Sequence, residues 1–479
     1  MRFLRERPSH DLTYSDVFLA PQRSSVGSRL SVDLTGEDPS GLRMPLVSAN
    51  MTSVTGPRLA AAMARRGGLG VLPQDLGLQE LDAAIHHVKQ ASTLYDPLVT
   101  VGPDATVRQA LSLVLDAPGA VITVLDEEGA PSRCLAVAAL RHALPDSRLA
   151  DLVADALPAI DDDDVTDSRA AFALIEAAGV EAVAVRHHGV ITATLSARSA
   201  VRSTIYSPAL DAHGRLRVAA AVGVTGEPGA RAAALVQAGV DVLVLDTAHG
   251  HQEQMVQALR EVRALQLGVP IVAGNVVTAE AAVELAEAGA DILKVGVGPG
   301  AMCTTRMMTA VGRPQFSAVL ETAEAVRDHG AHVWADGGVR YPRDVALALA
   351  AGASAVMVGS WFAGTLESPG EIEFDETGRP FTSSWGMAST KAVEQRFRRL
   401  DSFERARKAL FAEGISSSRI YLDPARSSLD DLLDMITSGL RSSMTYAGAA
   451  TLAEFRERAV VGTQSAAGYE EGKALPVSW

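Results

Sequence analysis

The chain has 479 residues, too many for one compact core, and its composition of 47% hydrophobic and 21% charged residues is ordinary for a soluble globular enzyme of about two domains. A formal net charge of -14 argues against a nucleic-acid-binding surface, because phosphate contacts need clustered Lys and Arg. Without a signal-peptide core, a run of roughly 18 apolar residues or a disulfide framework from its two cysteines, the sequence predicts a cytoplasmic protein with no membrane partner.

The first ninety residues begin a βα rhythm. Pro45–Ser48 and Leu69–Leu72 read as short buried strands, and Pro57–Arg66 between them reads as an Ala-rich helix. Gly67 and Gly68 end that helix. The rhythm then stops, so we assign residues 1–92 to the first part of an interrupted α/β domain.

From Thr93 to about Pro208 the βα pattern is replaced by two weakly similar units of about sixty residues each. The first contains a β run, Ala120–Leu125, that ends at a turn signal. The second contains an Ala-rich helix, Ser168–Ala178, and a matching strand, Ala182–Val185. The repeat resembles a pair of CBS domains, and we assign residues 93–208 to it.

The βα rhythm resumes in residues 209–479. Six further strands are expected at Val218–Ala221, Val242–Leu245, Ile271–Ala273, Ile292–Val295, Val333–Ala335 and Val356–Val358. Helices are expected between them at Ala230–Ala238, Gln252–Gln266, Ala279–Ala288, Ser317–Asp328 and Arg343–Ala350. Eight strands alternating with helices predict an α/β fold, a (β/α)8 TIM barrel with the repeat inserted after its second unit. After residue 364 we expect a β-hairpin over Phe374–Phe381 and a catalytic flap over about 386–430.

The stretch from Asp291 to Arg306 is the strongest functional signal. The strand Ile292–Val295 runs directly into glycines and then Cys303, on a loop where a barrel places its function. A cysteine beside Arg306 on such a loop is a candidate thiolate nucleophile. The alternative, that Cys303 is a small packing residue, stays open at this point.

Residues 296–306, Gly-Val-Gly-Pro-Gly-Ala-Met-Cys-Thr-Thr-Arg, closely resemble the catalytic loop shared by IMP dehydrogenases and GMP reductases. The resemblance extends from Leu12–Val17 to Gly439–Ser443. It implies that Cys303 attacks carbon 2 of a purine nucleotide, with GMP and IMP as substrate and product, and that the protein is a homotetramer or homo-octamer.

The resemblance also implies which residues bind the ligands. The substrate positions are Ser48, Met51, Asp336, Gly337, Gly338, Gly359, Ser360, Gly386 and Met387, with Asp336 on the ribose hydroxyls and Gly338, Gly359 and Ser360 at the phosphate. The nicotinamide dinucleotide positions are Asp246, Asn275 and Arg306, although the chain has no Rossmann fingerprint. A monovalent cation such as K+ is expected on the carbonyls of Gly298, Gly300 and Cys303. Ala301 and Ser384 depart from the family pattern and weaken two phosphate contacts.

Two flap features separate the activities of this family. The dehydrogenases hydrolyse their intermediate with an Arg-Tyr pair, and between Gly386 and Gly414 this chain has only Arg396-Phe397. The reductases use the second threonine of the cysteine loop and a flap glutamate, which here are Thr305 and Glu413. We therefore expect an NADPH-dependent GMP reductase of purine salvage, with Cys303, Thr305 and Glu413 catalytic. The inserted pair is more typical of the dehydrogenases, so an NAD-dependent IMP dehydrogenase making XMP is the alternative, followed by a catalytically silent nucleotide sensor.

The inserted pair lacks the usual nucleotide-binding residues. The positions where CBS units carry a Thr and an Asp hold Val137 and Leu140 in the first unit and Ser196 and Ser199 in the second. His187, His188 and Arg202 remain candidates for phosphate contacts, opposed by the acidic run at residues 161–164. We expect at most one weak nucleotide effector site and a role in assembly.

Overall fold

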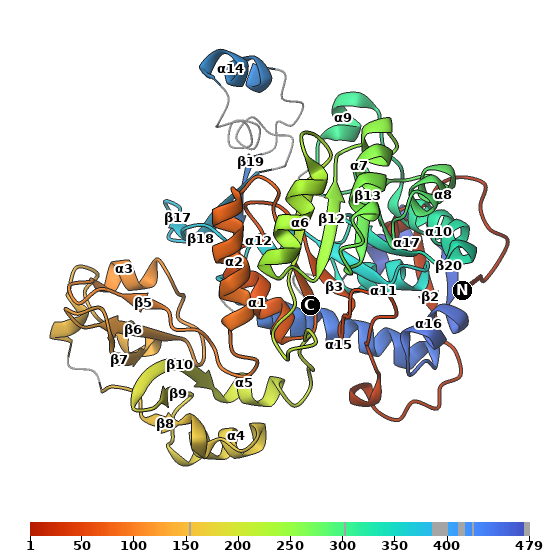
Figure 1. Cartoon of the computed structure of the whole chain (residues 1–479). Helices are drawn as coiled ribbons and strands as arrows, with labels where there is room; N and C mark the ends of the chain where they lie inside the picture. Colours follow the sequence, from red (N-terminus) through yellow and green to blue (C-terminus); the bar gives the residue numbers. More distant parts are fainter. Residues whose placement is uncertain (153–154, 301–302, 386–400, 411–416, 424–425, 474–479) are drawn as a thin grey trace.

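Eight parallel strands close into a barrel in the computed structural model, which describes residues 1–152, 155–300, 303–385, 401–410, 417–423 and 426–473 (Figure 1). The strands are β3 (Leu46–Ser48), β4 (Leu69–Leu72), β11 (Ala219–Gly223), β12 (Val242–Asp246), β13 (Ile271–Val276), β14 (Ile292–Val295), β15 (His332–Asp336) and β16 (Ala355–Val358). Each pairs in parallel with its neighbours, and β16 pairs with β3 to close the ring. All eight predicted strands are present, so the predicted TIM barrel is confirmed.

Helices surround the barrel. They are α1 (Pro57–Arg65), α2 (Leu78–Gln90), α6 (Pro228–Ala238), α7 (Glu253–Ala264), α8 (Ala279–Glu287), α10 (Gln315–Val326), α11 (Pro342–Ala350) and α15 (Leu429–Ala447). Proline stands first in α1, α6 and α11, where its missing N–H has no helical partner to lose. Helix α15, not predicted, packs against both α11 and α1 and so takes the place of the eighth barrel helix. No helix within the described residues has the length and apolarity to span a bilayer.

The barrel interior is a packed core of its own. It contains bulky side chains such as Trp334, Met357 and Ile292, together with small ones on β11, Ala219 and Ala221. The buried indole of Trp334 donates a hydrogen bond from Nε1 to a carboxylate oxygen of Asp38 at 2.8 Å, so its polar atom is satisfied. The interior is therefore filled by side chains and leaves the loops at its ends to form sites.

Residues between α2 and β11 form two small units outside the barrel, at the lower left of Figure 1. The first inserted unit consists of β5 (Thr100–Val101), α3 (Val107–Leu111), β6 (Val121–Leu125) and β7 (Pro131–Ala136). The second inserted unit consists of β8 (Ala159–Asp161), α4 (Ser168–Ala177), β9 (Ala182–His187), β10 (Val190–Ser196) and α5 (Ala197–Arg202). In both, a parallel pair is followed by an antiparallel hairpin. The units repeat one topology, as expected of a duplicated module.

The chain after β16 builds a small sheet beside the barrel. Following α12 (Ser360–Ala363), β17 (Glu373–Phe374) and β18 (Pro380–Trp385) form the predicted hairpin, and β19 (Ser417–Tyr421) pairs with β18. Helix α14 (Ser402–Leu410) falls between β18 and β19 in the chain. Leu115 of the first inserted unit packs against Ile372 and Leu422, so the insertion contacts the base of this sheet.

The two ends of the chain meet in a further sheet. Strand β20 (Val460–Thr463) lies between β1 (Arg2–Phe3) and β2 (Val17–Ala20), to the right in Figure 1. Two helices flank β20 in the sequence, α16 (Leu452–Arg458) and α17 (Ala466–Glu471). The Gln464 amide donates hydrogen bonds to carbonyls of Ser15 and Val17, which holds the C-terminal segment against the start of the chain.

A buried ionic cluster joins the second inserted unit to the barrel. Arg66, at the end of α1, donates from Nε and Nη2 to the two carboxylate oxygens of Asp430 at 2.9 and 2.7 Å. Arg202 of α5 donates to Asp431 at 2.7 Å and to Asp434 at 2.9 Å. Our expectation that Arg202 attracts a phosphate is therefore wrong, because its guanidinium is buried and already neutralised by carboxylates of α15.

Glu367, between α12 and β17, gives this region a predicted pH dependence. Its carboxylate accepts a hydrogen bond from the Leu429 N–H at 2.8 Å. Burial raises the pKa of Glu367 to about 7 from 4.5. The negative charge of nearby Asp430 also raises it, whereas the hydrogen bond from Leu429 lowers it. The folded state thus keeps a proton that the unfolded chain releases, so this carboxyl favours folding less as pH rises from about 4.5 to 7.

We expect Glu367→Gln, which cannot ionise, to gain thermal stability relative to the wild type as pH rises through that window and to hold the gain above it. Melting temperatures measured from about pH 4 to 8, a range that brackets the transition, are the check. Glu371→Gln, at an exposed position nearby, is the control. Parallel curves for Glu367→Gln and the wild type would contradict the raised pKa.

Candidate active site

The loop after β14 presents Cys303 to solvent. The Cys303 side chain is exposed, and its Sγ donates to the hydroxyl oxygen of Thr305 at 3.3 Å, while its N–H donates to the Gly300 carbonyl at 3.0 Å. Helix α9 (Thr305–Thr309) begins two residues later. The other cysteine, Cys134, is buried, and that burial raises the pKa of its thiol. The packing role considered for Cys303 fits Cys134 instead, and Cys303 has the exposure that a nucleophile needs.

The loops after β14 and β15 lie in direct contact. Gly296 has a φ of 151°, and a side chain there would overlap the backbone oxygen of Asp336. Gly337, with a φ of 85°, faces the backbone of Gly300, whose nitrogen would lie 3.3 Å from an added Cβ. Glycine at these two positions therefore lets the cysteine loop lie against Asp336, at the end of β15, and against the loop that follows it.

Three of the predicted ligand residues meet around a buried lysine that the sequence analysis did not single out. Lys294, on β14, is 3% exposed. Its Nζ lies 2.8 Å from Asp246 Oδ1 and 2.7 Å from Asp336 Oδ2, and it also donates to the Asn275 side-chain oxygen. The structure thus brings together two predicted cofactor residues, Asp246 and Asn275, and one predicted ribose residue, Asp336.

The charge balance of this group follows from those contacts. Burial alone would lower the pKa of Lys294, but the charges and hydrogen bonds of Asp246 and Asp336 outweigh burial and raise it. The lysine is therefore charged at neutral pH. One ammonium and two carboxylates leave one net negative charge, next to the surface where the cysteine loop lies.

Asn50 is a second residue that the sequence analysis left without a role. It follows β3, is 4% exposed, and donates from Nδ2 to Asp246 Oδ2 at 2.9 Å. Asp246 is thus held on one oxygen by Lys294 and on the other by Asn50. Both supporting residues had a detectable signal, a polar side chain inside or directly after an apolar parallel strand.

The other predicted substrate residues lie around the loops after β3 and β16. The hydroxyl of Ser48 is buried and accepts a hydrogen bond from Thr55 at 2.8 Å, so it faces the interior. The Met51 sulfur lies 3.4 Å from where a Cβ would stand at Gly359. Gly359 precedes α12, and Ser360 is its first residue. The assigned phosphate contacts of Gly338, Gly359 and Ser360 remain predictions.

The remaining predicted residues lie outside the described part of the chain or on the cysteine loop. Gly386, Met387 and Glu413 lie outside the described residues, as does Ala301. Arg306 is exposed and packs alongside Gly298. Carbonyl oxygens of the cysteine loop suit a hard cation, and the Gly300 oxygen, which accepts one hydrogen bond, has a second lone pair to offer. Over the described residues no cluster of three His, Cys, Asp or Glu is placed to bind a metal.

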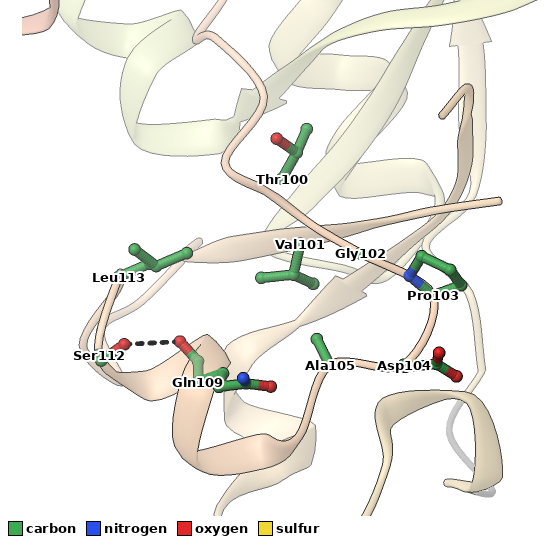
Figure 2. Close-up of a pocket in the computed structure, with 9 residues that line it drawn as sticks. All are labelled: Thr100, Val101, Gly102, Pro103, Asp104, Ala105, Gln109, Ser112 and Leu113. Atoms are coloured by element: carbon green, nitrogen blue, oxygen red, sulfur yellow. Dashed lines mark hydrogen bonds between the residues drawn. The ribbon is translucent and has the colours of Figure 1, made fainter. Parts of the chain in front are cut away.

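A separate open cavity of about 470 Å³ lies in the first inserted unit (Figure 2). Its lining residues are Thr100, Val101, Gly102, Pro103, Asp104, Ala105, Gln109, Ser112 and Leu113. The one charged side chain among them is Asp104, which pairs with Arg148. None of these lining residues is a Lys, Arg or His that could bind a phosphate, and this cavity is not part of the cysteine site.

The predicted positions of the inserted units have structural partners. Val137 and Leu140 are buried in the core of the first unit. Ser196 caps α5, and the Ser199 hydroxyl donates to Asp96 at 2.7 Å. His187 contacts Asp162 at 2.5 Å, within the acidic run, and its ring lies 4.1 Å from that of His188.

A barrel with an exposed cysteine after its sixth strand and acidic residues at the ends of its fourth and seventh strands defines a barrel enzyme with a built site at the carboxyl ends of its strands. Residues 11–474 match the family model described as "IMP dehydrogenase / GMP reductase domain". The chain belongs to this family.

Relatives on both sides of the family are similar over most or all of the chain. The chain is 53% identical over 488 aligned positions to the GMP reductase of Mycobacterium tuberculosis, covering all of both chains. It is 37% identical to the inosine-5'-monophosphate dehydrogenase of Aquifex aeolicus, over 96% of this chain and 94% of that one. Among solved structures, a cysteine-to-alanine variant of the Trypanosoma brucei GMP reductase in complex with guanosine 5'-monophosphate matches with a TM-score of 0.69 and 31% identity, over 98% of this chain and 99% of the other.

Proposed function

We propose that this chain is a GMP reductase that uses NADPH to convert GMP into IMP and ammonia in purine salvage. The 53% identity to a GMP reductase over the whole chain, against 37% to a dehydrogenase, supports the reductase. The contact that carries the chemistry is the one between Cys303 Sγ and the Thr305 hydroxyl. It sets a proton-transferring group beside the nucleophile.

The reaction takes place at carbon 2 of the purine. The Cys303 thiolate forms a C–S bond there, the C–N bond to the exocyclic amine breaks, and Thr305 with Glu413 supplies the proton with which ammonia leaves. Bound NADPH would supply the hydride that the same carbon takes up. The C–S bond then breaks, which returns the thiolate and releases IMP.

The remaining residues bind and orient. Asp336 accepts hydrogen bonds from the ribose hydroxyls, and Gly338, Gly359 and Ser360 hold the phosphate. The other residues around the nucleotide are Ser48, Met51, Gly337, Gly386 and Met387. Asp246, Asn275 and Arg306 hold the nicotinamide cofactor. A monovalent cation on the carbonyls of Gly298, Gly300 and Cys303 would order the cysteine loop.

One comparison of steady-state rates tests the proposal. The purified protein is expected to oxidise NADPH when GMP is added and to release one ammonia for each NADPH consumed. NAD reduction with IMP would make it an IMP dehydrogenase, the alternative that the insertion favours. Activity in neither assay would leave a nucleotide sensor, and titration of the intact chain with ATP and GTP would then measure the inserted pair. We propose at most one weak site there, so two tight sites would contradict us.

Replacing Thr305 by valine tests the proton-transfer role. We expect kcat for GMP reduction to fall by about a hundredfold, the lower range for loss of a general acid, while KM for GMP changes little. Thr304→Val, next to it, is the matched control and should keep most of the activity, because the Cys303 sulfur hydrogen-bonds to Thr305 and not to Thr304 in the described structure. A Thr305→Val enzyme with the wild-type kcat would remove Thr305 from the mechanism.

A further inference from the structure

We propose that Lys294 is a positioning residue that orients the carboxylate for the substrate ribose and the carboxylate for the cofactor at the same time. The inference rests on the proposed function, which assigns Asp336 to the ribose and Asp246 to the cofactor. It adds that the binding of both ligands depends on one buried ammonium that touches neither of them.

The geometry uses every proton of the ammonium. A lysine has three N–H donors. Here they go to Asp246 on β12 at 2.8 Å, to Asp336 on β15 at 2.7 Å, and to the side-chain oxygen of Asn275 on β13. Lys294 itself stands on β14, so one side chain ties the ends of four consecutive barrel strands together. None of its donors is left for a ligand.

Asn275 completes the arrangement. Its Nδ2 donates to the Gly296 carbonyl at 2.6 Å and to Asp336 Oδ2 at 2.9 Å. Because Lys294 bonds the oxygen of this amide, the nitrogen is directed at Asp336 and at the first glycine of the cysteine loop. Through Asn275, the lysine therefore also helps to position the loop that carries Cys303.

The carboxylates keep capacity for ligands. A carboxylate has about four acceptor sites. Asp336 Oδ2 accepts from Lys294 and Asn275, whereas its Oδ1 bonds no group within the described residues. Asp336 and Asp246 are both partly exposed, unlike Lys294. In the proposal the free oxygen accepts from the ligand, while the bonds to the other oxygen fix the direction of the carboxylate.

Loss of the ammonium changes the charge of the site. The charged groups that face one another are Lys294 from β14, Asp246 from β12 and Asp336 from β15. Without the cation, two carboxylates that shared one nitrogen repel each other, and the pKa of one of them rises. GMP would then bind to a mixture of protonation states, and its affinity would gain a pH dependence beyond that of the wild type.

The test measures binding and kinetics together in Lys294→Gln. We expect KM for GMP and KM for NADPH to rise together by about ten- to hundredfold, the range for loss of a supporting residue behind a ligand-holding group. Calorimetric affinity for GMP, measured relative to that of the wild type at each pH, should recover as pH is raised. A merely destabilising change would lower the active fraction, and so the apparent kcat, without moving either KM or the pH profile.

The chain offers a matched control. Lys89 is also buried between two carboxylates, Asp211 at 2.9 Å and Asp241 at 2.7 Å, and none of the three is part of the site. Lys89→Gln should lower the melting temperature but leave both KM values and the pH profile unchanged. The proposal is overturned if Lys294→Gln keeps the wild-type affinities and pH profile, or if Lys89→Gln reproduces its effects.

If Lys294→Gln does not fold, Lys294→Arg decides. The planar guanidinium keeps the charge but cannot place three donors around one point, so both KM values should still rise, without the pH shift. Unchanged KM values in a folded Lys294→Arg would overturn the proposal. The two proposals can fail separately. If the wild type does not oxidise NADPH, the reductase activity is refuted. The positioning role of Lys294 is then tested by the calorimetric affinity for GMP alone.

Discussion

Replacing Cys303 by alanine is expected to abolish GMP reduction while leaving GMP affinity within about threefold of the wild type. The thiolate provides the covalent path and little ground-state binding, so kcat should fall by about three orders of magnitude or more. The expectation depends on the exposure of Cys303 and its contact with Thr305. The checks are single-turnover kinetics and calorimetry with GMP.

Cys134 is the natural control for this experiment. It is 1% exposed, on β7 of the first inserted unit. Cys134→Ala should retain catalysis, with at most a modest loss of stability from the vacated volume. Substantial turnover by Cys303→Ala would rule out the covalent mechanism. If Cys303→Ala instead lost affinity for GMP, the sulfur would be needed for the shape of the binding site.

Replacing Arg66 by alanine is expected to destabilise the fold by about 3–5 kcal/mol, the cost of removing one partner from a buried ion pair. Arg66 is 1% exposed and binds both oxygens of Asp430. Burial would raise the pKa of Asp430, but Arg66 and Arg202 hold it at about 2. The change removes the nearer of the two cations. Denaturant unfolding at pH 7 is the measurement.

The matched control is a surface pair. Arg7 and Glu324 lie 2.9 Å apart with both side chains 46% exposed. Arg7→Ala should change stability by less than about 1 kcal/mol, because solvent screens an exposed pair. Equal effects from Arg7→Ala and Arg66→Ala would show that the buried pair of Arg66 and Asp430 stabilises the fold no more than an exposed pair does.

Most of the barrel could be predicted from the sequence because its signals are local. Parallel strands covered on both faces appear as short apolar runs, and all eight runs form strands. Pairing of Cys303 with Thr305 is equally local, since only one residue separates them. By contrast, α15 was not predicted, although Ser428 caps it and Leu433, Ile436 and Leu440 lie on its buried side.

Which residues pair in the long-range polar contacts had no such signal. Arg66 and Asp430 are 364 positions apart, so no spacing in the chain indicates their pairing. Arg202, expected at a phosphate, is instead neutralised by α15. The sequence analysis treated Lys294 as part of an apolar strand. A charged residue in a buried strand is almost always paired, so its presence there could have indicated an ion pair.

By itself the sequence determined the barrel, the repeated insertion and the cysteine loop, because hydrophobic period, turn chemistry and a long specific motif are properties of neighbouring residues. The tertiary structure alone decided which buried charges face each other. Closing the ring brings the ends of β12, β13, β14 and β15 to one edge, and there Lys294 meets Asp246, Asn275 and Asp336. Electrostatic energy depends on distances in space, which a linear chain does not contain until it folds.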